Sequence, residues 1–227
     1  MIDLEHSAKL SMRTRERFSA FIPFNYVSMI VQSLNGCRSI LDIGCGKGEI
    51  MMSIKRRINA YTVGLELYLP NLIEAKKMRS HNDFILADAR WLPIKSRIFD
   101  GVLCSQIVEH VTETEGLDIM DDIERISKLR VVIGTTVGYT PYLPLDPEND
   151  NNPFQIHKSG LSKETFISRG YHVRFQGLKL AYGPQGFMRR VPKPLRLWLG
   201  LICYLLSPIV CFASSLAFIQ VAWKAIQ

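Results

Sequence analysis

The sequence predicts an α/β fold in which a mostly parallel sheet is covered by helices on both faces. Two observations lead to this prediction. Short apolar segments alternate with longer helical ones through residues 36–140, and the short segments are apolar on both of their faces. Strands of that kind belong to parallel sheets with helices above and below them. Ligands of such sheets bind at the carboxyl ends of the strands.

Five strands are expected at residues 39–43, 61–67, 84–87, 99–105 and 129–137, and a sixth, half-solvated strand at 171–175. Helices are expected at 21–34, 49–57, 70–79, 114–127 and 162–168. Gly36 and Gly170 support two helix ends and Pro70 supports a helix start. The connection 138–160 is rich in Pro, Asn and Asp, and a connection of this length is usually functional or disordered.

Composition indicates one domain of 227 residues with a basic balance. The formal charge of +7 and the isoelectric point near 9.2 favour an anionic partner such as nucleic acid or an acidic lipid surface. The first 18 residues lack the apolar core of a signal peptide, so a cytoplasmic protein is expected. The cysteines support reduced thiols, since they are odd in number and have no CxxC spacing: Cys37, Cys45, Cys104, Cys203 and Cys211.

A glycine-rich turn, ILDIGCGKG at 40–48, follows the first expected strand. Glycine allows a tight turn and a close approach to a ligand, and the N–H groups of the following helix suit a carboxylate. An acid before the first glycine would repel a pyrophosphate but attract an ammonium group. The spacing GxGxG also differs from the GxGxxG of dinucleotide folds. The cofactor-binding residues predicted here are Asp42, Gly44, Cys45, Gly46 and Gly48.

Three later strand ends carry further candidate residues. Glu66 and Leu67 end the second strand, where an acid accepts hydrogen bonds from both ribose hydroxyls in folds of this type. Asp88 and Ala89 follow the third strand and are expected near an adenine amino group and ring. A turn or helix-cap role is the alternative for Asp88. Ser105 ends the fourth strand, which faces the reacting group.

These motifs, in this order and spacing, resemble those of class I S-adenosylmethionine-dependent methyltransferases over residues 36–140. The resemblance implies S-adenosyl-L-methionine as cofactor, with roles for Asp42, Gly44, Gly46, Glu66 and Asp88. It also implies a Rossmann-like, seven-stranded, mostly parallel sheet. Five strands are parallel, the sixth and seventh are antiparallel, and the seventh lies between the fifth and the sixth. The chain then divides into an N-terminal helical extension (1–35), a cofactor-binding core (36–140) and an acceptor-side part (141–227).

Methyl transfer needs mainly alignment, and a general base only when the acceptor is protonated. The predicted catalytic residues are Glu109 and His110, after the fourth strand, and His157 in the long connection. Glu109 and His110 look like part of the ExxEH element of quinone-biosynthesis O-methyltransferases, which is implicated in metal binding. Gln106 replaces the first acid of that element, so no metal site is predicted. The alternatives are a loop-bracing role for the Glu-His pair and a capping role for His157.

Residues 197–223 carry no charge and are long enough to span a bilayer, which takes about 20 residues. Three interpretations compete: a transmembrane helix, a seventh strand at 216–225 preceded by an apolar helical insertion at about 194–214, and ordinary core helices. The second is favoured because the fold requires a seventh strand. Basic residues before the insertion, with Trp198 and Tyr204 inside it, then suggest docking on an anionic membrane surface.

The predicted function is methyl transfer from S-adenosylmethionine to a small-molecule acceptor, with a lipid-soluble acceptor as an open candidate. The alternatives are a membrane-associated S-adenosylmethionine-binding protein without turnover and a methyltransferase of nucleic acid or protein. Ser105 to Val108 read SQIV, where many base methyltransferases have Asn/Asp-Pro-Pro-aromatic, which disfavours nucleic acid. The spacing of the glycine-rich turn disfavours a dehydrogenase.

Overall fold

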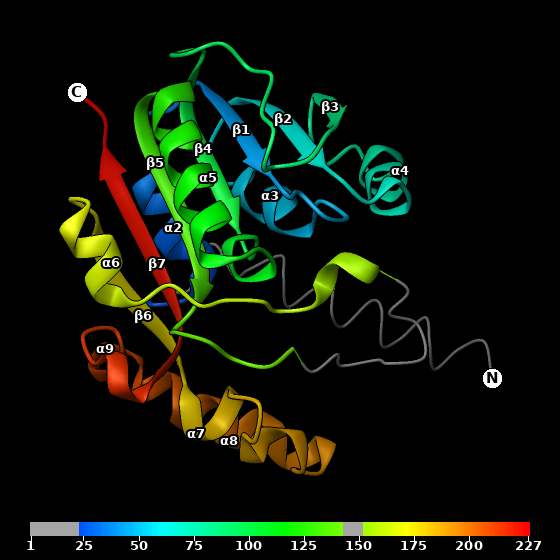
Figure 1. Cartoon of the computed structure of the whole chain (residues 1–227). Helices are drawn as coiled ribbons and strands as arrows, with labels where there is room; N and C mark the ends of the chain where they lie inside the picture. Colours follow the sequence, from blue (N-terminus) through cyan, green and yellow to red (C-terminus); the bar gives the residue numbers. More distant parts are fainter. Residues whose placement is uncertain (1–22, 143–151) are drawn as a thin grey trace.

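The computed structural model describes residues 23–142 and 152–227, and their centre is a seven-stranded sheet (Figure 1). The strand order is β3-β2-β1-β4-β5-β7-β6. The strands are β1 (Ser39–Ile43), β2 (Tyr61–Glu66), β3 (Asp83–Leu86), β4 (Phe99–Ser105), β5 (Ser127–Thr136), β6 (His172–Leu178) and β7 (Ala217–Ala225). Neighbours from β3 to β5 pair in parallel, which confirms the predicted α/β class. Strand β7 lies between β5 and β6, as predicted.

Strand β7 alone runs against the other six, which confirms the predicted antiparallel seventh strand. The expectation that the sixth strand is antiparallel as well is wrong. β7 pairs antiparallel with both β5 and β6, which gives β6 the same direction as β5. The reason lies in the connection, because the chain passes through helix α6 (Lys163–Ser168) between β5 and β6. A helical crossover of this kind returns the chain in the parallel direction.

Helices cover both faces of the sheet, as predicted. Strand side chains alternate between the faces, so in β1 Leu41 and Ile43 belong to one core cluster while Ile40 belongs to the other. Helices α5 (Glu113–Ile126) and α6 pack on the first cluster. Helices α2 (Tyr26–Ser33) and α3 (Glu49–Ile54) pack on the second. Helix α4 (Leu69–Lys77) buries Leu72 and Ala75 against Phe84 of β3.

Helix ends follow the local signals in the sequence. Asn25 caps α2 with a capping box shared with Ser28, so this helix starts later than the predicted residue 21. Residues 21 and 22, like the rest of 1–22, lie outside the described residues. Thr112 and Glu115 form the capping box of α5. Within the connection 138–160, residues 143–151 also lie outside the described part.

A helical insertion separates β6 from β7, as the sequence predicted. It contains α7 (Lys179–Tyr182), α8 (Lys193–Leu205), α9 (Ser207–Val210) and two 3-10 turns, η3 (Phe187–Arg189) and η4 (Ser214–Leu216). In Figure 1, α7 and α8 lie side by side beyond one end of the sheet. Within residues 23–142 and 152–227, no helix has the length and apolar character needed to cross a membrane.

Candidate active site

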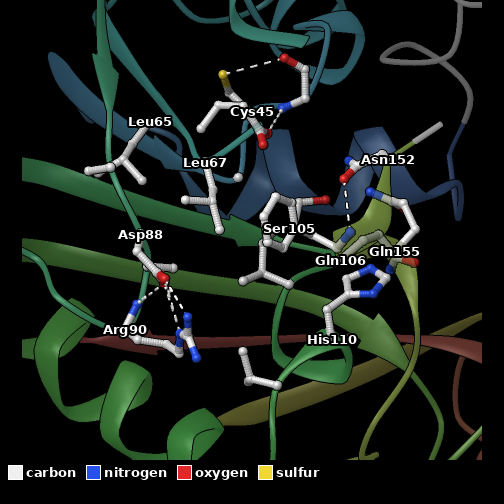
Figure 2. A pocket seen from close by; sticks show the side chains of 18 of the residues that line it. Cys45, Leu65, Leu67, Asp88, Arg90, Ser105, Gln106, His110, Asn152 and Gln155 are labelled. Atoms are coloured by element: carbon white, nitrogen blue, oxygen red, sulfur yellow. Dashed lines mark hydrogen bonds and ion pairs between the residues drawn. The ribbon is translucent and has the colours of Figure 1, made fainter. Parts of the chain in front are cut away.

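A cavity of about 370 Å³ opens at the carboxyl ends of β1, β2 and β4. Figure 2 shows Cys45 on one side of it, Asp88 and Arg90 on a second, and His110 near Gln155 and Asn152. Nine of the thirteen predicted site residues line it: Gly44, Cys45, Gly46, Glu66, Leu67, Asp88, Ala89, Ser105 and His110. The other four, Asp42, Gly48, Glu109 and His157, lie outside its lining.

The glycine-rich turn forms the floor of the cavity. Gly44 and Gly48 have φ of +69° and +83°, in the region that favours glycine. A Cβ on Gly44 would lie 1.9 Å from Cδ1 of Ile107, and a Cβ on Gly48 would lie 2.0 Å from Oγ of Ser80. Glycine is therefore required at both positions by backbone conformation and by space.

Asp42 lies below this turn rather than in the cavity. It is only 2% exposed, and its Oδ2 is 3.0 Å from Nε2 of His81. Nδ1 of His81 lies 2.8 Å from Oγ of Ser80, whose hydroxyl donates to the carbonyl of Ala75. The sequence predicted that Asp42 attracts a ligand ammonium group, whereas in the structure Asp42 belongs to a buried hydrogen-bond network beneath the turn. His81 was missed, because no local motif marks it.

Glu66 lies at the end of β2 and reaches back across the turn. Its Oε2 accepts a hydrogen bond from the N–H of Gly46, and its Oε1 accepts one from the N–H of Tyr68, both at 2.8 Å. The side chain still lines the cavity. An ionised carboxylate has about four acceptor positions, so Glu66 retains capacity for two hydroxyl donors.

Asp88 forms the next polar wall together with Arg90. Its Oδ1 accepts from the N–H of Arg90 at 2.9 Å, and its Oδ2 accepts from the Arg90 guanidinium at 2.6 Å. This guanidinium lowers the pKa of the Asp88 carboxyl and also reaches Glu115 at 3.1 Å. The alternative turn role of Asp88 is thus present as well, while its side chain still lines the cavity. Ala89, Leu67 and other apolar residues beside it make a surface suited to a flat ring.

Ser105 ends β4 under the centre of the cavity. Its hydroxyl lies 2.7 Å from the hydroxyl of Tyr26 in α2. Burial of Tyr26 raises the pKa of its phenol well above the usual range. The next residue, Gln106, has a φ of +57° and lines the cavity. Tyr26 was not found from the sequence, because it lies 79 residues from its partner.

Glu109, His110 and His157 come together beside the cavity. One ligand atom from each lies within 4.8 Å of the others, and the two imidazole rings are 4.8 Å apart. The N–H groups of Lys158 and Ser159 donate to the carbonyl of Glu109 and bring His157 to this place. All three residues were predicted from the sequence as catalytic. In the structure they lie together, although 47 positions separate His157 from His110.

Burial sets the protonation of this cluster. Burial raises the pKa of Glu109 to about 7, although Thr135 donates to its Oε2 at 2.9 Å. Burial, with His157 nearby, lowers the pKa of His110 to about 4, and burial also lowers the pKa of His157. Both imidazoles are thus neutral at pH 7.

The tautomers of the two histidines follow from their neighbours. Nδ1 of His157 lies 2.5 Å from the carbonyl oxygen of Thr140, and Nδ1 of His110 lies 3.4 Å from that of Ile156. Because a carbonyl oxygen only accepts, both Nδ1 atoms carry the proton. Each Nε2 then keeps a lone pair. Such a set could hold a metal, and the expectation of no metal stays a prediction.

Known proteins resemble this chain in a family domain, in sequence and in fold. Residues 41–130 match the methyltransferase domain family. A relative from Methanocaldococcus jannaschii, MJ0638, is 28% identical over 159 residues, which are 69% of this chain and 65% of the relative's length. A SAM-dependent methyltransferase from Archaeoglobus fulgidus is similar in structure, with 18% identity, a TM-score of 0.55 and coverage of 92% of this chain and 97% of that one.

A magnesium protoporphyrin IX methyltransferase from Synechocystis PCC 6803, solved with bound SAH, is also similar in structure. Its identity is 14% and its TM-score 0.51, with coverage of 88% of this chain and 82% of that one. At these identities the structural likeness shows the fold alone, and fold does not fix the reaction.

Proposed function

We propose that the chain, whose residues 41–130 match the methyltransferase domain family, is a class I S-adenosylmethionine-dependent methyltransferase and methylates a small, lipid-soluble hydroxyl acceptor beside His110. The observation that carries the proposal is the order of residues around the cavity. The Asp88–Ala89 pair, Glu66, the glycine-rich turn and His110 follow the ends of β3, β2, β1 and β4, which is the order of these strands in the sheet.

The cavity fits S-adenosylmethionine in size and chemistry. Its volume lies within the roughly 300–1,000 Å³ of small-ligand sites. In this proposal the turn from Gly44 to Gly48 receives the methionine moiety, and Glu66 accepts hydrogen bonds from the ribose hydroxyls. Asp88 and Ala89 take the adenine, and Asp42 positions the turn through His81 rather than by touching the ligand. The bound cofactor supplies a methyl group activated by its sulfonium.

The neutral His110 is the proposed proton acceptor. As a hydroxyl oxygen gains the methyl group it becomes strongly acidic, and its proton passes to Nε2 of His110. His157 and Glu109 are proposed as positioning residues. The ring of His157 packs on the ring of His110, and the carbonyl of Glu109 anchors the segment that carries His157. Tyr142 packs near both rings, at 6.3 Å from His110 and 5.5 Å from His157.

A turnover assay tests this function. Formation of S-adenosylhomocysteine is measured with the full chain and three acceptor classes: hydrophobic phenols in detergent, RNA or DNA, and protein. We expect transfer to a phenol, and a loss of about 10²–10⁴ in kcat in His110→Ala, which is the range for a general base. His172→Ala, an exposed histidine on β6, is the matched control. Transfer only to nucleic acid or to protein would contradict the proposal.

A further inference from the structure

Helices α8 and α9 and the turn after α9 expose large apolar side chains, and we call the surface that they form the apolar face. Its side chains are between 50% and 73% exposed: Leu195, Leu197, Trp198, Leu201, Ile202, Leu205, Ile209 and Phe212. Soluble monomers rarely leave a contiguous apolar patch of more than a few hundred Å² in water, and larger ones mark interaction sites.

Helix α8 turns small residues toward the protein and large apolar residues toward solvent, which is the opposite of an ordinary surface helix. Its inner side carries Gly200 and Cys203, both close to Tyr182 of α7. Cys203 is 7% exposed, whereas Leu201 and Ile202 beside it are 50% and 55% exposed. A surface helix normally turns its large apolar residues inward. The large side chains of α8 therefore have a role outside the fold of this chain.

Charge around the apolar face has one sign. The insertion, residues 179–216, contains no Asp or Glu, but it contains five basic residues: Lys179, Arg189, Arg190, Lys193 and Arg196. Lys179, Arg189, Arg190 and Arg196 belong to the insertion and are exposed. Two copies of such a surface would repel each other, whereas an anionic partner would be attracted.

The apolar face extends from the edge of the sheet on which the cavity opens. Leu178, the last residue of β6, pairs with Ala217, the first residue of β7. Thr136, at the carboxyl end of β5, pairs with Ile219, two residues further along β7. The insertion therefore leaves and re-enters the sheet at the carboxyl edge, and Figure 1 shows α7 and α8 beyond that edge.

From these observations we propose that the apolar face docks on an anionic lipid bilayer, with α8 lying along the interface and its apolar side in the acyl region. Amphipathic helices with basic neighbours bind membranes in this way, at a depth of about 5–10 Å. This inference rests on the proposed function in one respect: the membrane would be the source of the lipid-soluble acceptor and would bring it to the carboxyl edge. Lipid binding itself requires neither cofactor nor methyl transfer, so the two proposals can fail separately.

Vesicle flotation of the full chain tests the docking, without S-adenosylmethionine. Vesicles of phosphatidylcholine alone are compared with vesicles of phosphatidylcholine and phosphatidylglycerol in equal parts. We expect binding to the anionic vesicles and weaker binding to the neutral ones. Leu201→Asn/Ile202→Asn, at two exposed sites, should weaken binding on the order of 100-fold. Arg189→Gln/Arg190→Gln should weaken it about 25-fold on anionic vesicles only.

Matched controls separate docking from general effects. Lys55→Gln/Lys76→Gln removes the same charge from exposed positions on α3's C-terminal cap and on α4, and should leave binding unchanged. Brominated lipid should quench the fluorescence of Trp198, and Trp198→Phe should lose most of that quenching while Trp91→Phe keeps it. Failure to bind anionic vesicles would overturn the proposal, as would a dimer in solution that Leu201→Asn/Ile202→Asn makes monomeric.

Discussion

Replacing Gly44 by alanine tests how the turn under the cavity is built. Two costs add at this position. A φ of +69° costs an alanine about 1–2 kcal/mol. The new Cβ would also meet Cδ1 of Ile107 at 1.9 Å and Cγ1 at 2.4 Å, and crowding of a packed site costs about 1–3 kcal/mol. The expected loss in the free energy of unfolding is therefore about 2–5 kcal/mol.

Gly46→Ala is the matched control for this prediction. Gly46 has a similar φ of +55°, but a Cβ there would have nothing within 4 Å. Only the conformational cost of about 1–2 kcal/mol applies. Urea unfolding of both variants gives the difference between their free energies of unfolding. In Gly44→Ala/Ile107→Ala, the loss should be smaller than the sum of the losses in the two single variants, because part of the crowding is relieved. Equal destabilisation by the two glycine substitutions would refute the reasoning.

Tyr26→Phe should lower the free energy of unfolding by about 1–2 kcal/mol, because the buried hydroxyl of Ser105 loses a partner. The exposed control Tyr61→Phe should change it by less than about 0.5 kcal/mol in the same urea titration. Burial raises the pKa of Glu109 from 4.5 to about 7, so folding favours the protonated acid and stability falls as pH rises through 7. Between pH 4.5 and a pH above 7, the free energy of unfolding of the wild type should fall by about 3 kcal/mol relative to that of Glu109→Gln. Urea unfolding at each pH measures this difference. Parallel pH curves for the two proteins would contradict the prediction. Glu66→Gln should weaken S-adenosylmethionine binding about tenfold or more, because a charged acceptor is lost, and calorimetry measures it against Glu74→Gln on the surface of α4.

Much of the sheet could be predicted because its signals are local. The strand at 99–105 has the predicted bounds, since an apolar run between polar residues defines it. The glycine-rich turn was also predictable, because its backbone conformation requires glycine at fixed spacing. The insertion before β7 followed from counting the strands that the fold needs.

Contacts between distant residues could not be predicted in the same way. Asp42 was expected to face a ligand, but its partner His81 lies 39 positions away and only the folded chain brings them together. The direction of β6 depends on the crossover through α6 rather than on its own residues. The quinone O-methyltransferase subgroup stays a prediction, because the residues around His110 define a site without defining its acceptor.

Calorimetric titration of the full chain with S-adenosylmethionine tests the central claim most directly. We expect saturable, stoichiometric binding that Glu66→Ala abolishes and that the apolar-face variant Leu201→Asn/Ile202→Asn retains. NAD should show no binding, because the turn has the wrong spacing for a dinucleotide. Binding of NAD in place of S-adenosylmethionine, or S-adenosylmethionine binding that is unchanged in Glu66→Ala, would contradict the assignment of this cavity.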